Sequence, residues 1–186
     1  MSWRAERLRR IGIVFGLGAF LLFPVIAGFA DSGEAAPPFS LQTLDGKTVT
    51  RDSLKGKVVL LDFWATWCAP CLKALPELKD LRQKNAGQPL VIVSVSVDED
   101  KKTVQDFASR NGMDWVQAWD GQFKAVSAFR VDSFPSYVLL DSEGRIAFRQ
   151  KGWSPGRTAA ALGAAVTKAL ESVHRPAAAK GDASTR

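Results

Sequence analysis

Two cysteines, Cys68 and Cys71, are the residues of this sequence best suited to chemistry. They are the only cysteines in the chain, and Ala69 and Pro70 lie between them. An apolar run at 58–61 precedes the pair and leucines at helical spacing follow it, which predicts the end of a buried strand and the start of a helix. Proline suits a first helical turn. The unpaired N–H groups and the dipole of that turn stabilise a thiolate.

This position predicts dithiol–disulfide exchange. The Cys68 thiolate is expected to attack a substrate disulfide, and Cys71 is expected to resolve the mixed disulfide by attacking Cys68. We expect Cys68 to be the more exposed cysteine and Cys71 to lie one turn deeper.

A zinc site and a purely structural disulfide are the alternatives. Zinc takes about four Cys, His or carboxylate ligands, but the chain has no further cysteine, and its one histidine, His174, lies in a polar C-terminal stretch. A bridge that closes so short a loop constrains the unfolded chain little, so stability is a poor reason for it. We therefore expect no metal and no cofactor other than the redox-active Cys68–Cys71 pair.

Asp62 is the charged residue of the strand expected at 58–64, where it stands among Leu61, Phe63 and Trp64. Burial of a carboxyl group raises its pKa, which makes it a base nearer neutral pH. Asp62 is therefore the candidate that removes the proton from Cys71. The alternative is that it only accepts hydrogen bonds from the chain. Charged residues are seldom buried without a partner or a role, which favours the base.

The net charge of +6 does not form a basic patch. Residues 1–30 contain four arginines and one glutamate, a net charge of +3, and the rest of the charge is spread along the chain. We expect no nucleic acid partner.

The length and the hydrophobic fraction of 46% fit one globular domain with a full core.

Residues 1–30 have the pattern of an export segment. The arginines precede an apolar run at 11–23, and the small residues Gly28 and Ala30 suit a signal peptidase. An uncleaved membrane anchor is the alternative, because residues 11–29 approach the roughly 20 that a helix needs to cross a bilayer. In either case the rest of the chain is expected outside the cytoplasm, where disulfides persist.

The remaining chain is expected to comprise a linker at 31–38, a folded domain at 39–174 and a disordered tail at 175–186. The expected elements are a hairpin around Asp45-Gly46, strand 58–64, a helix from Cys71 to Asn85 that Pro76 bends, strand 90–97, helix 101–111 capped within 98–100, strand 114–118, helix 123–129, a hairpin of 137–140 and 146–149, and a helix from 154 or 155 to 174. This order predicts an α/β fold in which a mixed central sheet carries helices on both faces.

The run from Leu61 to Cys71, LDFWATWCAPC, with Pro76 five residues later, resembles the active-site segment of thioredoxin. Phe134-Pro135 before a strand resembles the cis-proline loop of that family. The export segment, the extra hairpin and the inserted helix and strand at 98–118 are similar to the TlpA, ResA and CcmG type of membrane-associated thiol–disulfide proteins. The resemblance covers about residues 37–172 and implies a thioredoxin-like fold.

The resemblance also implies site residues and partners. Pro135 is expected to be cis, and the backbone of Phe134 is expected to pair with the substrate chain like an added strand. Trp67, with Ala69 and Pro70, is expected to offer a contact surface for substrate, whereas Trp64 is expected in the core. Protein thiols or disulfides are the expected substrates of a monomer that a membrane partner re-reduces.

Three positions depart from the family pattern. Ala74 stands where the TlpA-like group commonly has a glutamate three residues after the second cysteine, so Asp62 is expected to take over as the acid–base group. Phe134 is bulkier than the usual residue before the cis-proline, which is expected to reshape substrate recognition. Strand 90–97 offers no lysine to pair with Asp62.

The resemblance favours a reductase, for example in cytochrome c maturation, over a disulfide-donating oxidase, although the dithiol motif itself does not set the direction. A thiol peroxidase is a second enzyme class. Peroxiredoxins share the fold but use Pro-x-x-x-Thr-x-x-Cys, and here Leu61 and Ala65 occupy the Pro and Thr positions. A copper carrier is a non-enzymatic alternative that needs a histidine near the thiols.

Overall fold

The computed structural model describes residues 33–174, and the expected export segment and C-terminal tail lie outside this part. The strands are β1 (Ser40–Thr43), β2 (Thr48–Thr50), β3 (Val58–Trp64), β4 (Leu90–Ser96), β5 (Val116–Trp119), β6 (Ser136–Leu140) and β7 (Ile146–Lys151). The helices are α1 (Ala69–Lys84), α2 (Lys101–Arg110), α3 (Lys124–Ala128) and α4 (Arg157–His174), with a short 3₁₀ helix η1 (Asp52–Leu54). Within the described residues, no helix is both long and apolar enough to span a bilayer.

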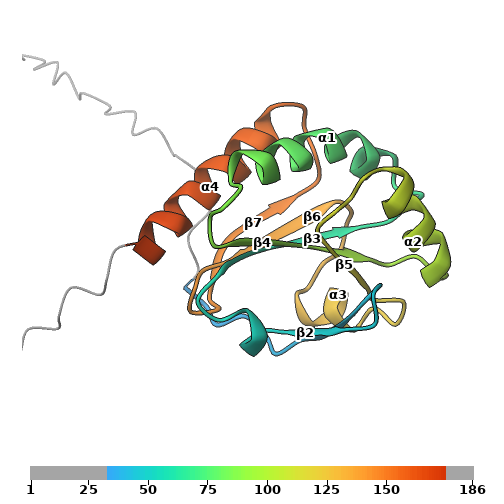
Figure 1. Cartoon of the computed structure of the whole chain (residues 1–186), viewed down its shortest axis with the longest axis horizontal. Helices are drawn as coiled ribbons and strands as arrows, with labels where there is room; N and C mark the ends of the chain where they lie inside the picture. The colour runs from blue at the N-terminus through green and yellow to red at the C-terminus, as the bar shows by residue number, and fades with distance from the viewer. Residues whose placement is uncertain (1–32, 175–186) are drawn as a thin grey trace, which may run out of the picture.

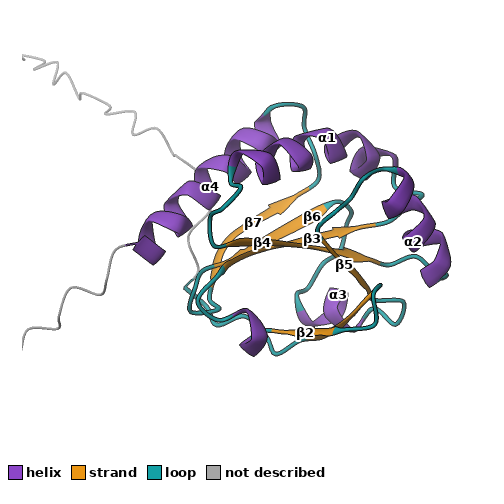
Figure 2. Ribbon diagram, in the orientation of Figure 1, coloured by secondary structure: helices purple, strands orange, loops and turns teal. Residues whose placement is uncertain are grey.

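The strands form one mixed sheet in the order β2-β1-β5-β4-β3-β6-β7. The central strands β3, β4 and β5 are parallel, whereas β1 joins β5, and β6 joins β3, in antiparallel pairs. Figure 2 shows this sheet between helices on both sides. The predicted fold class, the N-terminal hairpin (β1–β2) and the inserted helix and strand (α2 and β5) are therefore confirmed.

The helices form two layers around the sheet. Figure 1 shows α1 and α4 together over one face and α3 on the opposite face. Leucines and valines of α1, α4, β3 and β6 form the core on the α1–α4 side. All seven residues of β3 are buried, as expected of a strand covered on both faces. The chain therefore leaves β3 from the middle of the core, and this rigid strand positions the loop and the helix that come after it.

The inserted helix α2 begins at Asp100, whose carboxylate accepts the N–H groups of Lys102 and Thr103 at 3.1 and 3.0 Å. This is the N-cap that the acidic run at 98–100 predicted. The strand predicted at 114–118 begins later, at Val116. The reason is that pairing with β4 starts only there, opposite Val93.

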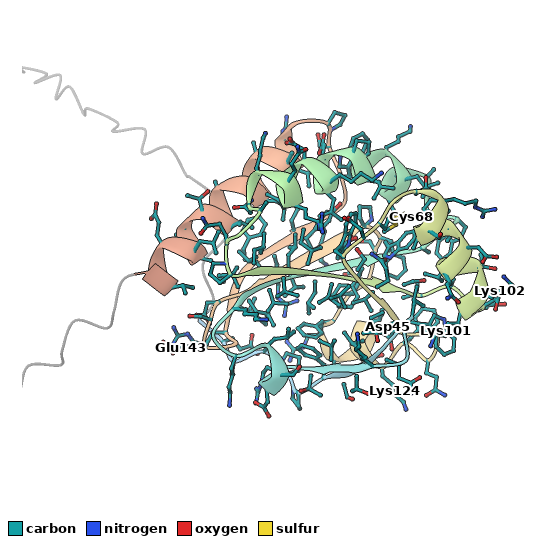
Figure 3. The ribbon with its side chains drawn as sticks, viewed as in Figure 1. Asp45, Cys68, Lys101, Lys102, Lys124 and Glu143 are labelled. Carbon is teal, nitrogen blue, oxygen red and sulfur yellow. A yellow bond between two sulfur atoms is a disulfide. The ribbon has the colours of Figure 1, made fainter. Side chains whose placement is uncertain are left out.

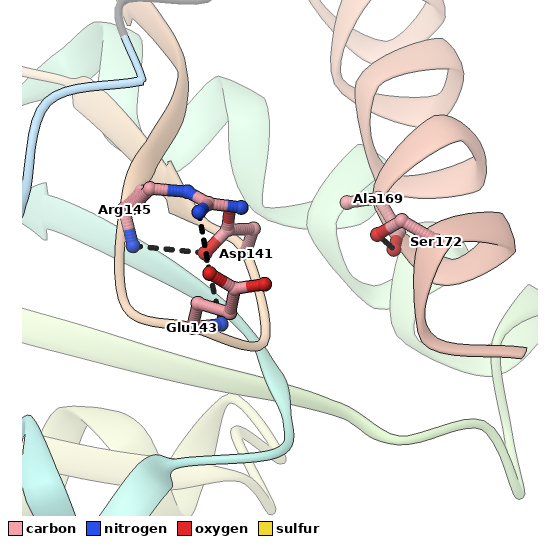
Figure 4. Close-up of polar contacts among 5 residues, drawn as sticks. All are labelled: Asp141, Glu143, Arg145, Ala169 and Ser172. Atoms are coloured by element: carbon pink, nitrogen blue, oxygen red, sulfur yellow. Dashed lines mark hydrogen bonds and ion pairs between the residues drawn. The ribbon is translucent and has the colours of Figure 1, made fainter. Parts of the chain in front are cut away.

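The turn between β6 and β7 is held by one carboxylate. Figure 4 shows Asp141 accepting hydrogen bonds from the backbone N–H groups of Glu143 and Arg145 and from the Arg145 guanidinium, each at 2.9 Å. In the same view, Ser172 of α4 donates to the carbonyl of Ala169. The Asp141 contacts satisfy the backbone of a tight turn locally, which is what Asp favours in turns.

Residues expected in the linker contact this turn. The N–H of Ala36 donates to the carbonyl of Gly144 at 3.0 Å, and the N–H of Ile146 donates to the carbonyl of Glu34 at 2.8 Å. The guanidinium of Arg51 donates to the Ala36 carbonyl at 2.8 Å. Because Ala36 is also buried, the packed part of the chain reaches at least to residue 34.

Candidate active site

Cys68 and Cys71 form a disulfide at the junction of β3 and α1. Figure 3 labels Cys68 on the side of the domain where α2 lies. Cys68 is the N-cap of α1, and its sulfur accepts the N–H of Cys71 at 3.3 Å. The exposed residues Ala69 and Pro70 occupy the first helical turn. The predicted position of the pair at a helix start is therefore confirmed, although α1 begins at Ala69, two residues earlier than the expected Cys71. The Cys71 amide of this first turn points at the Cys68 sulfur, where it would stabilise a thiolate.

The expectation that Cys68 is the more exposed cysteine is wrong for this oxidised form. Cys68 is 5% exposed and Cys71 is 7% exposed. Both sulfurs are held in the disulfide at the start of α1, and both cysteines are buried there. What distinguishes the two cysteines is their backbone position, because Cys68 precedes the helix and Cys71 lies within its first turn.

Asp62 is buried, with 5% of its surface exposed, on the second half of β3. It accepts one hydrogen bond, from the Ser94 hydroxyl, over 2.8 Å. Burial raises the pKa of Asp62 from its ordinary value of 3.8 to about 7, and the Ser94 bond opposes this shift. Within residues 33–174 no lysine or arginine forms an ion pair with Asp62. The predicted burial and the direction of the pKa shift are thus confirmed.

Cross-strand pairing places three polar side chains in a row. Asp62 is directly opposite Ser94 of β4 and Tyr137 of β6. The indole N–H of Trp115 donates to the Ser94 hydroxyl oxygen at 2.9 Å. Burial raises the pKa of Tyr137, and the charges of Asp62 and Glu77 act in the same direction, so the phenol stays neutral when Asp62 titrates.

A second buried carboxylate, Asp98, holds the loop that leads to the cysteines. It accepts the N–H of Thr66 at 3.0 Å, the Thr66 hydroxyl at 2.6 Å and the Ser96 hydroxyl at 2.6 Å. Its own backbone carbonyl accepts the indole N–H of Trp119 at 2.7 Å. The segment immediately before Trp67 and Cys68 is therefore fixed to the ends of β4 and β5.

The Trp119 ring covers a glycine. A Cβ atom at Gly121 would lie 2.1 Å from the Trp119 ring, which no real structure tolerates. Glycine is therefore the residue that lets Trp119 lie over the chain and reach Asp98.

An aromatic surface lies beside the disulfide. Trp67 is 65% exposed, and its ring packs edge-to-face against half-buried Phe134, with the centroids 6.1 Å apart. The Phe134–Pro135 bond is cis, as the resemblance predicted. Trp64 is in the core, also as predicted. The structure therefore brings Trp67 and Phe134 together, whereas their contact with a substrate stays a prediction.

Ala74 is buried on α1 and leaves no acidic group where the TlpA-like glutamate is expected. Among residues 33–174, no three His, Cys, Asp or Glu side chains are grouped to hold a metal ion.

The sequence pattern did not identify Ser94, Trp115, Thr66 or Asp98 as site residues. The sequence does hint at the contacts of Ser94 with Asp62 and of Ser96 with Asp98. These two serines interrupt an otherwise apolar strand, and both are fully buried. Buried hydroxyl groups need partners, and each serine donates to an aspartate. Trp115 and Thr66 have no such signal, since their partners are known only once β3, β4 and β5 are aligned.

The profile of the Redoxin family matches residues 31–166 of this chain. The thiol–disulfide oxidoreductase ResA of Bacillus anthracis is 32% identical over 145 residues, which cover 75% of this chain and 84% of that protein. ResA of Bacillus subtilis (strain 168) is 32% identical over 136 residues, which cover 72% of this chain and 76% of that protein.

A solved structure of a thiol–disulfide protein is also similar to this chain. The crystal structure of a thiol:disulfide interchange protein of the thioredoxin family from Chlorobium tepidum TLS superposes with a TM-score of 0.64 at 26% identity. The superposition covers 76% of this chain and 99% of that one.

Proposed function

Because the chain belongs to the Redoxin family and is a thiol–disulfide oxidoreductase, we propose that it acts outside the cytoplasm as a reductant of disulfides in proteins. The observation that carries the chemistry is the N-cap position of Cys68, with the Cys71 amide directed at its sulfur. The arginines and the apolar run of residues 1–30 support export or anchoring.

The reaction moves two electrons from the dithiol to the substrate. The Cys68 thiolate attacks one sulfur of the substrate disulfide, so that a Cys68–substrate bond forms and the other substrate sulfur leaves as a thiolate that takes up a proton. Asp62 then removes the proton from the Cys71 thiol. The resulting thiolate attacks Cys68, which closes the Cys68–Cys71 disulfide and releases the second substrate thiolate.

Trp67, Ala69, Pro70 and the Phe134–Pro135 segment form the surface on which the substrate chain lies. The exposed indole and the Phe134 ring favour apolar side chains around the substrate cysteine. A dithiol partner in the membrane returns the Cys68–Cys71 pair to the reduced state, and cytochrome c maturation is one process that requires such a reductant.

The equilibrium reduction potential of the Cys68–Cys71 pair tests the proposed direction. A potential near roughly −270 mV is expected of an electron donor. A potential near roughly −120 mV would mean that the protein donates disulfides instead. The Cys71→Ser variant should trap substrate on Cys68, whereas the Cys68→Ser variant should not.

A further inference from the structure

We propose that Ser94 and Trp115 are positioning residues for Asp62. The three side chains form a hydrogen-bond relay: the Trp115 indole N–H fixes the Ser94 hydroxyl, and the Ser94 hydroxyl proton then points at the Asp62 carboxylate. The proposal rests on the proposed role of Asp62 as the base for Cys71. It is based on the two hydrogen bonds, of 2.9 Å and 2.8 Å, that meet at the Ser94 oxygen.

A serine hydroxyl has one proton and two lone pairs. Because the Trp115 indole can only donate, it occupies a lone pair of the Ser94 oxygen and leaves the hydroxyl proton for Asp62. Hydrogen bonds in such a chain polarise one another, which makes Ser94 a better donor than a lone hydroxyl would be. The relay therefore favours the ionised carboxylate in a site where burial opposes it.

The burial of Ser94 and the position of Trp115 make this relay the main polar contact of the Asp62 side chain. Ser94 is fully buried, and half-buried Trp115 lines an open cleft of about 630 Å³ whose lining does not include Ser94. The indole therefore separates the hydroxyl from water in the cleft, so that water does not compete for it. Without Trp115, the serine proton would be free to rotate toward other acceptors.

The other groups that bear on Asp62 are neutral or of like charge. From β6, Tyr137 lies opposite Asp62 and stays protonated. The two cysteines at the start of α1 are held in a disulfide and carry no charge. Glu77 of α1 acts on Tyr137 and is itself bonded to the Trp153 indole and the backbone N–H of Gly156. From α4, this face of the sheet receives apolar side chains and the neutral, buried Thr158. No described cation could substitute for the relay.

The test is the pKa of Asp62 in the oxidised protein, read from the ¹³C shift of its carboxyl carbon. Ser94→Ala should raise this pKa by about one unit, because a hydrogen bond to the charged form is lost. Trp115→Phe should raise it by less, because Ser94 can still donate but is no longer fixed. Ser94→Thr, which keeps the hydroxyl, should restore the wild-type value.

Matched controls lie on the same strands. Ser96→Ala removes an equally buried hydroxyl that bonds to Asp98, and Trp119→Phe removes an indole donor to a backbone carbonyl. Neither should move the pKa of Asp62. In the wild type, the Trp115 indole N–H resonance should shift with the same midpoint, about 7, and Asp62→Asn should abolish that shift.

An unchanged pKa of Asp62 in both Ser94→Ala and Trp115→Phe would overturn the relay, and Trp115→Phe alone decides if Ser94→Ala does not fold. The proposed role of Asp62 as the base for Cys71 is judged separately, by the pH profile of the resolution step. If the pKa moves in these variants but that profile does not follow, the relay stands and Asp62 is not the base.

Discussion

At the scale of single residues, Asp62 combines burial, the absence of a described cationic partner and one hydrogen bond from Ser94. Its pKa of about 7 means that near neutral pH it can both hold and release a proton. In the proposed mechanism this group serves Cys71, which is buried in the first turn of α1.

Asp62→Asn should slow the resolution step by roughly tenfold or more while leaving the first attack by Cys68 nearly unchanged. In the wild type, resolution should quicken as the pH rises through about 7, because Asp62 must be ionised to accept a proton. The variant should lack this dependence. Stopped-flow measurement of mixed-disulfide formation and decay separates the two steps.

Asp120→Asn is the matched control, because Asp120 is a buried carboxylate that accepts the N–H groups of Lys124 and Val126 in α3 and lies outside the proposed chemistry. It should leave the pH profile of resolution intact. Equal decay rates of the mixed disulfide in Asp62→Asn and wild type would remove Asp62 from the mechanism.

The same residue should make stability depend on pH. Between pH 3.8 and about 7, the folded protein keeps a proton on Asp62 that the unfolded chain has released, so the free energy of unfolding falls as the pH rises through this window. Asp62→Asn removes this penalty. Above pH 7 the oxidised variant should be more stable than the wild type by up to about 4 kcal/mol, and near pH 4 the two should converge.

Urea unfolding of the two oxidised proteins at a series of pH values measures this difference. A constant difference between pH 4 and pH 8 would show that Asp62 does not titrate in that range.

At the scale of elements, the reactive loop is held from outside the cysteine motif. Asp98, which lies two residues after the end of β4, binds both the backbone and the side chain of Thr66. Since β4 and β5 are central strands, the loop before Cys68 takes its geometry from the rigid middle of the sheet. This is the kind of support that keeps a reactive group in place.

Asp98→Ala should leave the Thr66 N–H, the Thr66 hydroxyl and the Ser96 hydroxyl without their acceptor. A loss of about 3 kcal/mol or more in the free energy of unfolding is expected. The Thr66 amide should exchange with solvent at least tenfold faster, as hydrogen-exchange NMR would show.

The control is Asp100→Ala, which removes the N-cap of α2 two residues later at a cost of about 1 kcal/mol. It should leave exchange at Thr66 unchanged. If both variants accelerate exchange at Thr66 equally, the loop responds to general destabilisation and not to Asp98.

At the scale of the whole molecule, the first residues of the domain bind to the turn between β6 and β7. Residues 34–36 are tied to the β6–β7 turn and to Arg51 by three hydrogen bonds. A chain that begins at Pro37 should therefore be less stable than one that begins at Gly33, by about 3 kcal/mol at roughly 1 kcal/mol per bond.

Thermal unfolding of the two shortened proteins measures this. A chain that begins at Glu34 is the control and should match the longer one, because it keeps all three bonds. Equal stability of the chains beginning at Pro37 and Gly33 would show that residues 34–36 contribute nothing.

Much of this architecture can be predicted from the sequence, because apolar runs and turn signals are local. The strand 58–64, a helix start at the cysteine pair and the burial of Asp62 were all predicted. The low exposure of Cys68 was not, since it depends on how the loop before α1 packs onto the sheet. Partners such as Ser94 lie 32 residues from Asp62 along the chain, and no local pattern states which strands become neighbours.

The cover that Trp119 forms over Gly121 has an evolutionary consequence. Any side chain at position 121 would collide with the indole, which in turn holds the carbonyl of Asp98. Relatives that keep tryptophan at the position of 119 should therefore keep glycine at that of 121, whereas relatives with a smaller residue at 119 are free to vary there. The two positions should change together over generations, although neither belongs to the cysteine motif by which such proteins are recognised.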